Sequence, residues 1–347
     1  MEVLQGNCHE KTQKVYLCNF KISNLMFKRT PFLILIIGLL LPIIPLKAQE
    51  QQAYKVGLVG FYNLENLFDT IDDPNKLDEE FLPNGTNQWN TEKYTTKLHN
   101  MAYSISTIGT DITPDGVAVL GLSEMENRTV LEDLVAQPEI KDRNYQIVHY
   151  DSPDRRGVDV GLIYNPKYFK VTNVKKYRFV CPGQPNFISR DQLVVTGVFD
   201  DEEMSFIVMH WPSRYGGEKR SLPGRVAAAS ICRHITDSIL NEKPDAKVIM
   251  MGDYNDYPTN KSITEYLGAK GKVSEMQKGD YFNPMWKMHQ NGEGTSYYRD
   301  VKGVLDQMIV TPALLKDDAD PFATYQMMKP MVHSKEFLKQ HGGRYNG

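Results

Sequence analysis

The sequence carries a series of short apolar runs, rich in β-branched and aromatic residues, that recur along most of its length. Runs of this length and composition are typical of β-strands. They predict strands at residues 56–61, 116–122, 145–149, 158–164, 192–199, 204–209, 247–251 and 304–310. The runs at 192–199 and 204–209 lie close enough in sequence to form a hairpin.

Helical patterns lie between some of these strands. Apolar residues repeat at spacings of three and four over 91–108, which predicts an amphipathic helix. Asn127 is expected to cap a second helix that carries Val130 and Leu134, and a third helix is predicted at 225–240. Because strands outnumber helices, the pattern favours mixed α/β sheets covered by helices over a doubly wound parallel sheet.

The composition is that of an ordinary globular protein. Of the 347 residues, 41% are hydrophobic and 24% are charged, so the chain can bury a sizeable core. From residue 54 onward the sequence shows no linker, charge block or internal repeat. A single domain over residues 54–347 is therefore expected.

One long apolar run, residues 32–46, follows Lys28 and Arg29 and precedes the small residue Ala48. This is the pattern of a secretory signal peptide, and the run is short for a membrane span. We expect residues 26–48 to be a signal peptide cleaved near Ala48, residues 1–25 to be an upstream extension that is not translated, and the protein to be periplasmic or extracellular. An N-terminal membrane anchor or a buried core helix is the alternative.

Loss of this leader would change the charge and the cysteine content. The full chain has 40 basic and 43 acidic residues, and cleavage would remove six and two of them, leaving 34 and 41 and a formal charge of −7. An acidic balance argues against a protein that mainly grips nucleic acid by its phosphates. Cys181 and Cys232 would remain, and their spacing does not tell whether they pair.

Polar residues follow several predicted strands, which is where an α/β scaffold presents its chemistry. Asn63 follows the first strand, although it could simply satisfy a turn, and Glu124 follows the second. A carboxylate directly after a buried strand is costly unless it is paired or binds a cation. His210 follows the strand at 204–209, either as a structural histidine or, with Arg214 nearby, as part of a positive region suited to an anion.

The most specific motif is Gly252-Asp253-Tyr254-Asn255, after the strand at 247–251. Residues two apart on an extended segment face the same way, so Asp253 and Asn255 can act together, one as a base or metal partner and the other as a phosphate donor. A simple Asx turn is the alternative. Asp306 interrupts the last apolar run and would need a positive partner there, such as a metal or His210.

Two arginines are further candidates. Arg156 and Arg190 each carry a planar guanidinium that could clamp a phosphate, or each could be a solvated loop cation.

Taken in order, these five segments resemble the endonuclease/exonuclease/phosphatase superfamily, which includes DNase I-like nucleases, exonuclease III-like endonucleases, sphingomyelinases and inositol polyphosphate 5-phosphatases. The resemblance extends over residues 54–347. It implies a four-layer α/β sandwich, in which two mixed β-sheets pack face to face with helices outside. It also implies hydrolysis of phosphoester bonds with Mg²⁺ or Mn²⁺ as the cofactor.

The resemblance further implies a role for each polar residue at the metal end of the site. Glu124 would be the principal metal ligand, and Asn63 would belong to the same metal and phosphate cluster. Asp253 and Asn255 would orient or activate the attacking water and contact the phosphate. Such a site suits Mg²⁺, which prefers one or two carboxylates together with water and substrate oxygens.

The remaining residues would act on the developing charge. By the same resemblance, His210 would stabilise the transition state or leaving group, and Asp306 would support a catalytic histidine. An imidazolium at His210 and the arginines Arg156, Arg190 and Arg214 would donate to phosphate oxygens.

One part of the family pattern is missing. The superfamily's last motif is a Ser-Asp-His type segment on a C-terminal strand, and no such segment or apolar strand is predicted after Asp306 and the run that contains it. His333 and His341 are the histidines there, and neither follows an Asp or is expected to end a strand. Either the sequence is truncated or a last strand is missing, and loss of the pair could silence a chain that still binds metal.

Three functions therefore stay open. Hydrolysis of phosphodiester bonds in DNA or RNA comes first, hydrolysis of a phospholipid headgroup or small phosphate ester second, and binding of a phosphorylated ligand without turnover third. No stable membrane span is expected after cleavage, and no protein partner is indicated.

Overall fold

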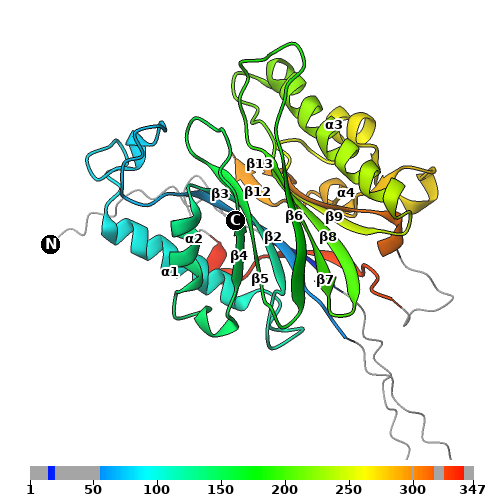
Figure 1. Ribbon diagram of the computed structural model, residues 1–347, viewed down its shortest axis with the longest axis horizontal. Helices are drawn as coiled ribbons and strands as arrows, with labels where there is room; N and C mark the ends of the chain where they lie inside the picture. The colour runs from blue at the N-terminus through cyan, green and yellow to red at the C-terminus, as the bar shows by residue number, and fades with distance from the viewer. Residues whose placement is uncertain (1–14, 20–54, 299–300, 316–323, 340–347) are drawn as a thin grey trace, which may run out of the picture.

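The computed structural model describes residues 15–19, 55–298, 301–315 and 324–339. Two large sheets pack face to face, with α1 (Thr91–Thr107) and α2 (Arg128–Val135) outside one and α3 (Glu218–Glu242) outside the other (Figure 1). This confirms the four-layer sandwich of two mixed sheets that the sequence led us to expect. The expected signal peptide at 26–48 and His341 lie outside the described residues.

The first sheet has six strands. In spatial order they are β15 (Lys329–His333), β1 (Val15–Asn19), β2 (Val59–Leu67), β3 (Val119–Met125), β5 (Asp159–Tyr164) and β4 (Gln146–His149). The strands β2 and β3 are parallel, whereas β3 and β5 are antiparallel.

The second sheet has seven strands. In spatial order they are β10 (Ala269–Lys270), β11 (Tyr281–Phe282), β14 (Asp306–Val310), β9 (Lys247–Asp253), β8 (Glu202–His210), β7 (Gln192–Phe199) and β6 (Phe169–Tyr177). Here β8 and β9 are parallel and β9 and β14 antiparallel, so both sheets are mixed.

Shorter elements complete the described fold. They are a hairpin of β12 (Ser296–Tyr298) and β13 (Val301–Gly303), the helix α4 (Met285–Gln290), a π-helix at Ser262–Leu267, and 3₁₀ turns at Glu79–Phe81, Lys141–Arg143, Val273–Glu275, Pro312–Leu314 and Glu336–Leu338. None of the helices in the described ranges is both long and apolar enough to cross a membrane.

The layers are held together by apolar side chains on alternate positions of the strands. Phe61, Leu162 and Phe206 belong to the cluster between the two sheets, and other clusters lie under α1 with α2 and under α3. The sheets approach closely at Gly121 in β3, where an added Cβ would lie 2.5 Å from the sulfur of Met251 in β9. Glycine is therefore required there by the neighbouring sheet and not by its own backbone angle.

Several local predictions are confirmed. The helix expected at 91–108 is α1, and Asn127 caps α2 by accepting a hydrogen bond from the Val130 amide. The expected hairpin is formed by β7 and β8, with Asp200 in its turn at a φ of 55°.

Three predictions were wrong. The helix expected to begin at Arg225 begins at Glu218, because the segment around Pro223 and Gly224 packs against Phe187 despite its weak helix propensity. The strand β6 was missed because it lies at an edge of the sheet and most of its side chains are polar and exposed. Finally, a strand does follow Asp306: it is β15, and His333 ends it.

His333 is a buried histidine at the end of β15. Its Nε2 is 2.9 Å from the Thr107 hydroxyl, at the end of α1 that leads into the start of β3. Burial lowers its pKa to about 4. A depressed pKa means that the folded state favours the neutral imidazole, so the unfolded chain binds the proton more readily.

We therefore expect this group to add stability above about pH 6.5 that is lost as the pH falls toward 4, amounting to roughly 2 kcal/mol. The difference in unfolding free energy between wild type and His333→Gln, measured in urea at pH 7 and pH 4.5, should shrink by this amount at the lower pH. The exposed His234→Gln is the matched control and should show no such change. Equal pH dependence in wild type and His333→Gln would contradict the assignment.

Candidate active site

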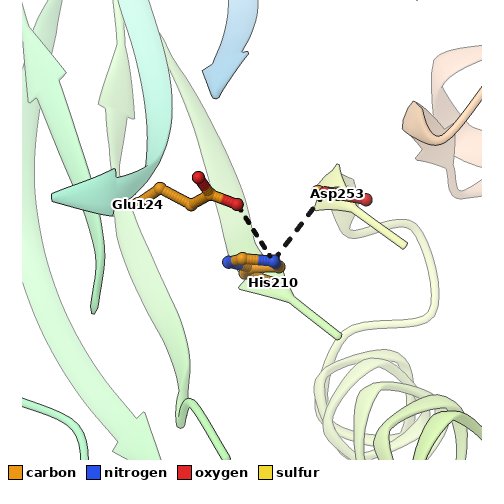
Figure 2. Close-up of side chains that lie close together, drawn as sticks. All are labelled: Glu124, His210 and Asp253. Carbon is orange, nitrogen blue, oxygen red and sulfur yellow. Dashed lines mark ion pairs between the residues drawn. The ribbon is translucent and has the colours of Figure 1, made fainter. Parts of the chain in front are cut away.

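Side chains from both sheets meet at one end of the sandwich. Glu124 lies in β3 of the first sheet, while His210 and Asp253 end the neighbouring strands β8 and β9 of the second and are paired in register. Figure 2 shows the three side chains facing one another. The His210 Nε2 lies 3.7 Å from Glu124 Oε1 and 3.7 Å from Asp253 Oδ2.

The backbone at Glu124 is unusual and helps to aim its carboxylate. Its φ is 60°, a left-handed conformation that is uncommon for residues other than glycine. The pairing of β3 with both β2 and β5 shifts register around this residue. Such bulges re-aim a side chain relative to a regular strand, and here they accompany a residue at the site.

Two asparagines flank Asp253. The Asn63 amide donates to Asp253 Oδ2 at 3.4 Å, and the Asn255 backbone amide donates to Asp253 Oδ1 at 2.8 Å. The side chain of Asn255 donates to the Trp211 carbonyl at 3.0 Å. The expected pairing of Asp253 with Asn255 therefore takes the form of an Asx turn that also orients the carboxylate, so the two readings are not exclusive.

Asp306 lies at the start of β14, directly opposite Asp253 in the antiparallel register. The sequence suggested that it interrupts a strand, whereas the regular strand begins with it. Burial, and next the charge of Asp253, raise the pKa of its carboxyl well above the usual range. The raised pKa favours the neutral carboxyl of Asp306, which lessens the repulsion between it and Asp253.

The surroundings of His210 favour its neutral form. The ring is buried, and its Nδ1 has no hydrogen-bond partner among the described residues. Burial, followed by the charges of Arg190 and Arg156, holds its pKa well below the usual value. The imidazolium expected from the sequence is therefore disfavoured here, and a neutral ring can act as a ligand or a single N–H donor.

Arg190 holds the strand end that carries His210. Its guanidinium donates to the carbonyls of His210 at 3.1 Å and Trp211 at 2.6 Å, and pairs with Asp154 at 3.3 Å. The side chain is buried and burial lowers its pKa. These contacts fix its guanidinium to the backbone at the end of β8, and the phosphate contact expected from the sequence stays a prediction.

The other two arginines lie nearer the surface. Arg214 donates to the Asn255 carbonyl at 2.7 Å and lies over the Tyr257 ring, 4.3 Å from its centroid. Arg156 is about half exposed, with its Nε 3.8 Å from Asp154 Oδ1, and its charge acts on His210. Of the three predicted phosphate-binding arginines, Arg156 therefore has the side chain most open to solvent.

A buried ion pair, which the sequence analysis did not predict, stabilises the loop that follows β9. Asp256 Oδ2 lies 2.7 Å from Arg225 Nε, and both side chains are fully buried. Asp256 also accepts from the Ser262 hydroxyl at 2.5 Å and pairs with Arg214 at 3.2 Å. The available signal was its position, because Asp256 directly follows the Asp253-Tyr254-Asn255 motif.

The donor set fits a divalent cation. One oxygen of Glu124, one of Asp253 and one nitrogen of His210 lie within 4.8 Å of one another, close to the spacing of ligands around a single ion. The His210 Nε2 lies 3.7 Å from an oxygen of each carboxylate, and a cation bound among these three atoms would offset the cost of bringing the two carboxylates together. Cys181 and Cys232 are both free and buried and take no part.

Comparison with known proteins now identifies the class. The model of the endonuclease/exonuclease/phosphatase family matches residues 58–347, and the chain belongs to this family. Its members are phosphoesterases and generally depend on divalent metal ions. Comparison with curated proteins gives no match.

Solved structures with a similar fold include three named proteins. The human Nocturnin catalytic domain is 16% identical over 62% of this chain and 79% of its own, with a TM-score of 0.43. Truncated Caenorhabditis elegans TDP2 is 17% identical (62% and 78%, TM-score 0.42), and Bacteroides thetaiotaomicron mannosyl-6-phosphatase Bt3783 is 15% identical (64% and 81%, TM-score 0.44). Likeness at this level says nothing about substrate.

The contacts of Arg190 predict how the site responds to its loss. In Arg190→Met the buried carboxylate of Asp154 would lose its closer charged partner and keep the half-exposed Arg156, and the carbonyls of His210 and Trp211 would each lose a charged donor. We expect a loss of about 3–5 kcal/mol in unfolding free energy, measured by urea titration. The exposed neighbour Arg155→Met should change stability by less than about 0.5 kcal/mol, and similar losses in the two variants would refute the structural role.

Proposed function

We propose that this protein is an exported, Mg²⁺- or Mn²⁺-dependent phosphoesterase that hydrolyses phosphodiester bonds, with nucleic acid as the first substrate to test. The observation that carries the proposal is the convergence of Glu124, His210 and Asp253 from three strands and both sheets. Membership of a phosphoesterase family supports the reaction type. Export rests on the apolar run at 32–46 behind Lys28 and Arg29.

The ion would be held by the carboxylates of Glu124 and Asp253, with His210 and the Asn63 amide beside them. When bound, it supplies Lewis-acid polarisation of a phosphoryl oxygen. By the family resemblance, Asp253 would orient or activate the attacking water, and its carboxylate lies beside His210 and the Asn63 amide. Asn63 and Asn255 hold that carboxylate in place through the hydrogen bonds described above.

A phospholipid headgroup or small phosphate ester is the second candidate substrate. The chain left after cleavage near Ala48 would carry a formal charge of −7, which weakens the nuclease version because long-range repulsion slows the approach of a polyanion. Substrate choice is therefore the first question for an assay.

The decisive comparison is between two neighbouring glutamates. Glu124→Gln removes one negative charge from the site. Glu126→Gln instead changes a carboxylate that accepts a hydrogen bond from the Asp69 backbone amide, beside α2. With Mg²⁺ or Mn²⁺, we expect Glu124→Gln to lower kcat by about 10²- to 10³-fold, the range seen when one group that stabilises the transition state is lost. Glu126→Gln should keep most of the activity.

The assay would use purified protein with plasmid DNA, an aryl phosphodiester, sphingomyelin and a sugar phosphate, each with metal and with EDTA. Turnover that needs metal and depends on Glu124 would support the proposal, and the preferred substrate would separate the two candidates. Absence of turnover on all four, with metal binding retained, would replace hydrolysis by binding of a phosphorylated ligand.

A further inference from the structure

We infer that Lys97, in α1, is a positioning residue that fixes the bulge of β2 from which Asn63 reaches the active site. The inference rests on the proposed function, since it concerns the same site. Lys97 lies on a helix outside the first sheet and touches none of the three converging side chains directly in the contacts described above. Its role follows from the backbone that it holds.

The bulge lies where β2 passes the site. Asn63 pairs with Ser123 and Leu67 pairs with Met125, so residues 64–66 of β2 face the single residue Glu124 of β3. Within this bulge Glu65 has a φ of 47° and Asn66 a φ of 61°. Two successive left-handed residues, neither of them glycine, store backbone strain unless their surroundings offset it.

Lys97 provides that offset. Its ammonium donates to the Glu65 carbonyl at 2.5 Å and to the Asn66 carbonyl at 3.1 Å. Hydrogen bonds from a charged donor are roughly twice as strong as neutral ones. The ammonium also lies 5.6 Å from the centre of the Trp89 ring, and Trp89 itself donates to the Phe68 carbonyl at 2.9 Å. Lys97 thus holds the bulge itself, and Trp89 holds the chain just after it.

The bulge is linked directly to the metal-binding side. The Glu65 amide donates to Asn63 Oδ1 at 2.8 Å, and the Asn63 amide donates to Asp253 Oδ2 at 3.4 Å. The peptide unit that orients Asn63 therefore directly precedes the two peptide units that Lys97 holds. Glu124 faces the bulge from β3, so its own left-handed backbone depends on the bulge as well.

The experiment compares Lys97→Met with Lys97→Arg and Lys93→Met. Methionine keeps an apolar stem against Trp89 but cannot donate, and arginine keeps the donors. Lys93, one turn earlier in α1, donates to the Asn87 carbonyl outside the bulge and is the matched control. The readouts are Mn²⁺ affinity by electron paramagnetic resonance and amide hydrogen exchange of residues 62–68.

For Lys97→Met we expect Mn²⁺ binding about 10- to 100-fold weaker, the range for outer partners of metal ligands. Exchange of residues 62–68 should be at least about tenfold faster, with α1 unchanged. Lys97→Arg should recover part of both, and Lys93→Met should match wild type. Unchanged exchange in Lys97→Met, or an equal effect in Lys93→Met, would overturn the inference.

Two further outcomes are distinguishable. If wild-type protein shows no metal-dependent turnover and no Mn²⁺ binding, the proposed function fails, while the exchange measurement still judges the role of Lys97. If Lys97→Met does not fold, Lys97→Gln, which can donate to one carbonyl only, takes its place, and wild-type exchange in that variant would reject the inference.

Discussion

Face-to-face packing of the two sheets is the interaction on which the site depends. Neither sheet alone holds the three converging side chains, because Glu124 belongs to one and His210 and Asp253 to the other. The apolar cluster between the sheets sets how far apart the strand ends lie. The hydrophobic effect itself has no directional preference. Because the apolar interior is close-packed, however, it holds the charged groups of the two sheets at a defined distance.

Electrostatic constraints follow from that packing. Bringing acidic side chains together in a partly buried place is unfavourable unless a proton or a cation compensates. Two features offset this cost: the raised pKa of Asp306 favours its neutral form, and the positive charges of Arg190 and Arg156 act near His210. The buried pair of Asp256 and Arg225 serves the neighbouring loop in the same way.

Much of this architecture could be predicted from the sequence, for physical reasons that also explain the failures. The strands and α1 carry strong periodic patterns because one face of each is buried, and Asn127 carries its own capping signal. The strand β6 carries no such pattern, since an edge strand can expose most of its side chains. The early start of α3 depends on Phe187, which lies far away in sequence.

The candidate site shows the same division. Residues that directly follow a buried strand, such as Glu124 and Asp253, were found because a polar group there is costly. Lys97 and Arg190 act by donating hydrogen bonds to backbone carbonyls, and nothing in the sequence distinguishes them from other basic residues. Only the folded chain shows which carbonyls they hold.

Gly121 has a consequence for the choice of ion. Gly121 lies three residues before Glu124, and at this glycine the two sheets touch through Met251. The contact leaves little room for a closer approach, so it sets the gap between the opposing carboxylates. A larger side chain at that position would wedge the sheets apart and widen the opening between Glu124 and Asp253. The ionic radius that the site accepts would then depend on the packing of Met251 against a glycine, at a point where no ligand atom is present.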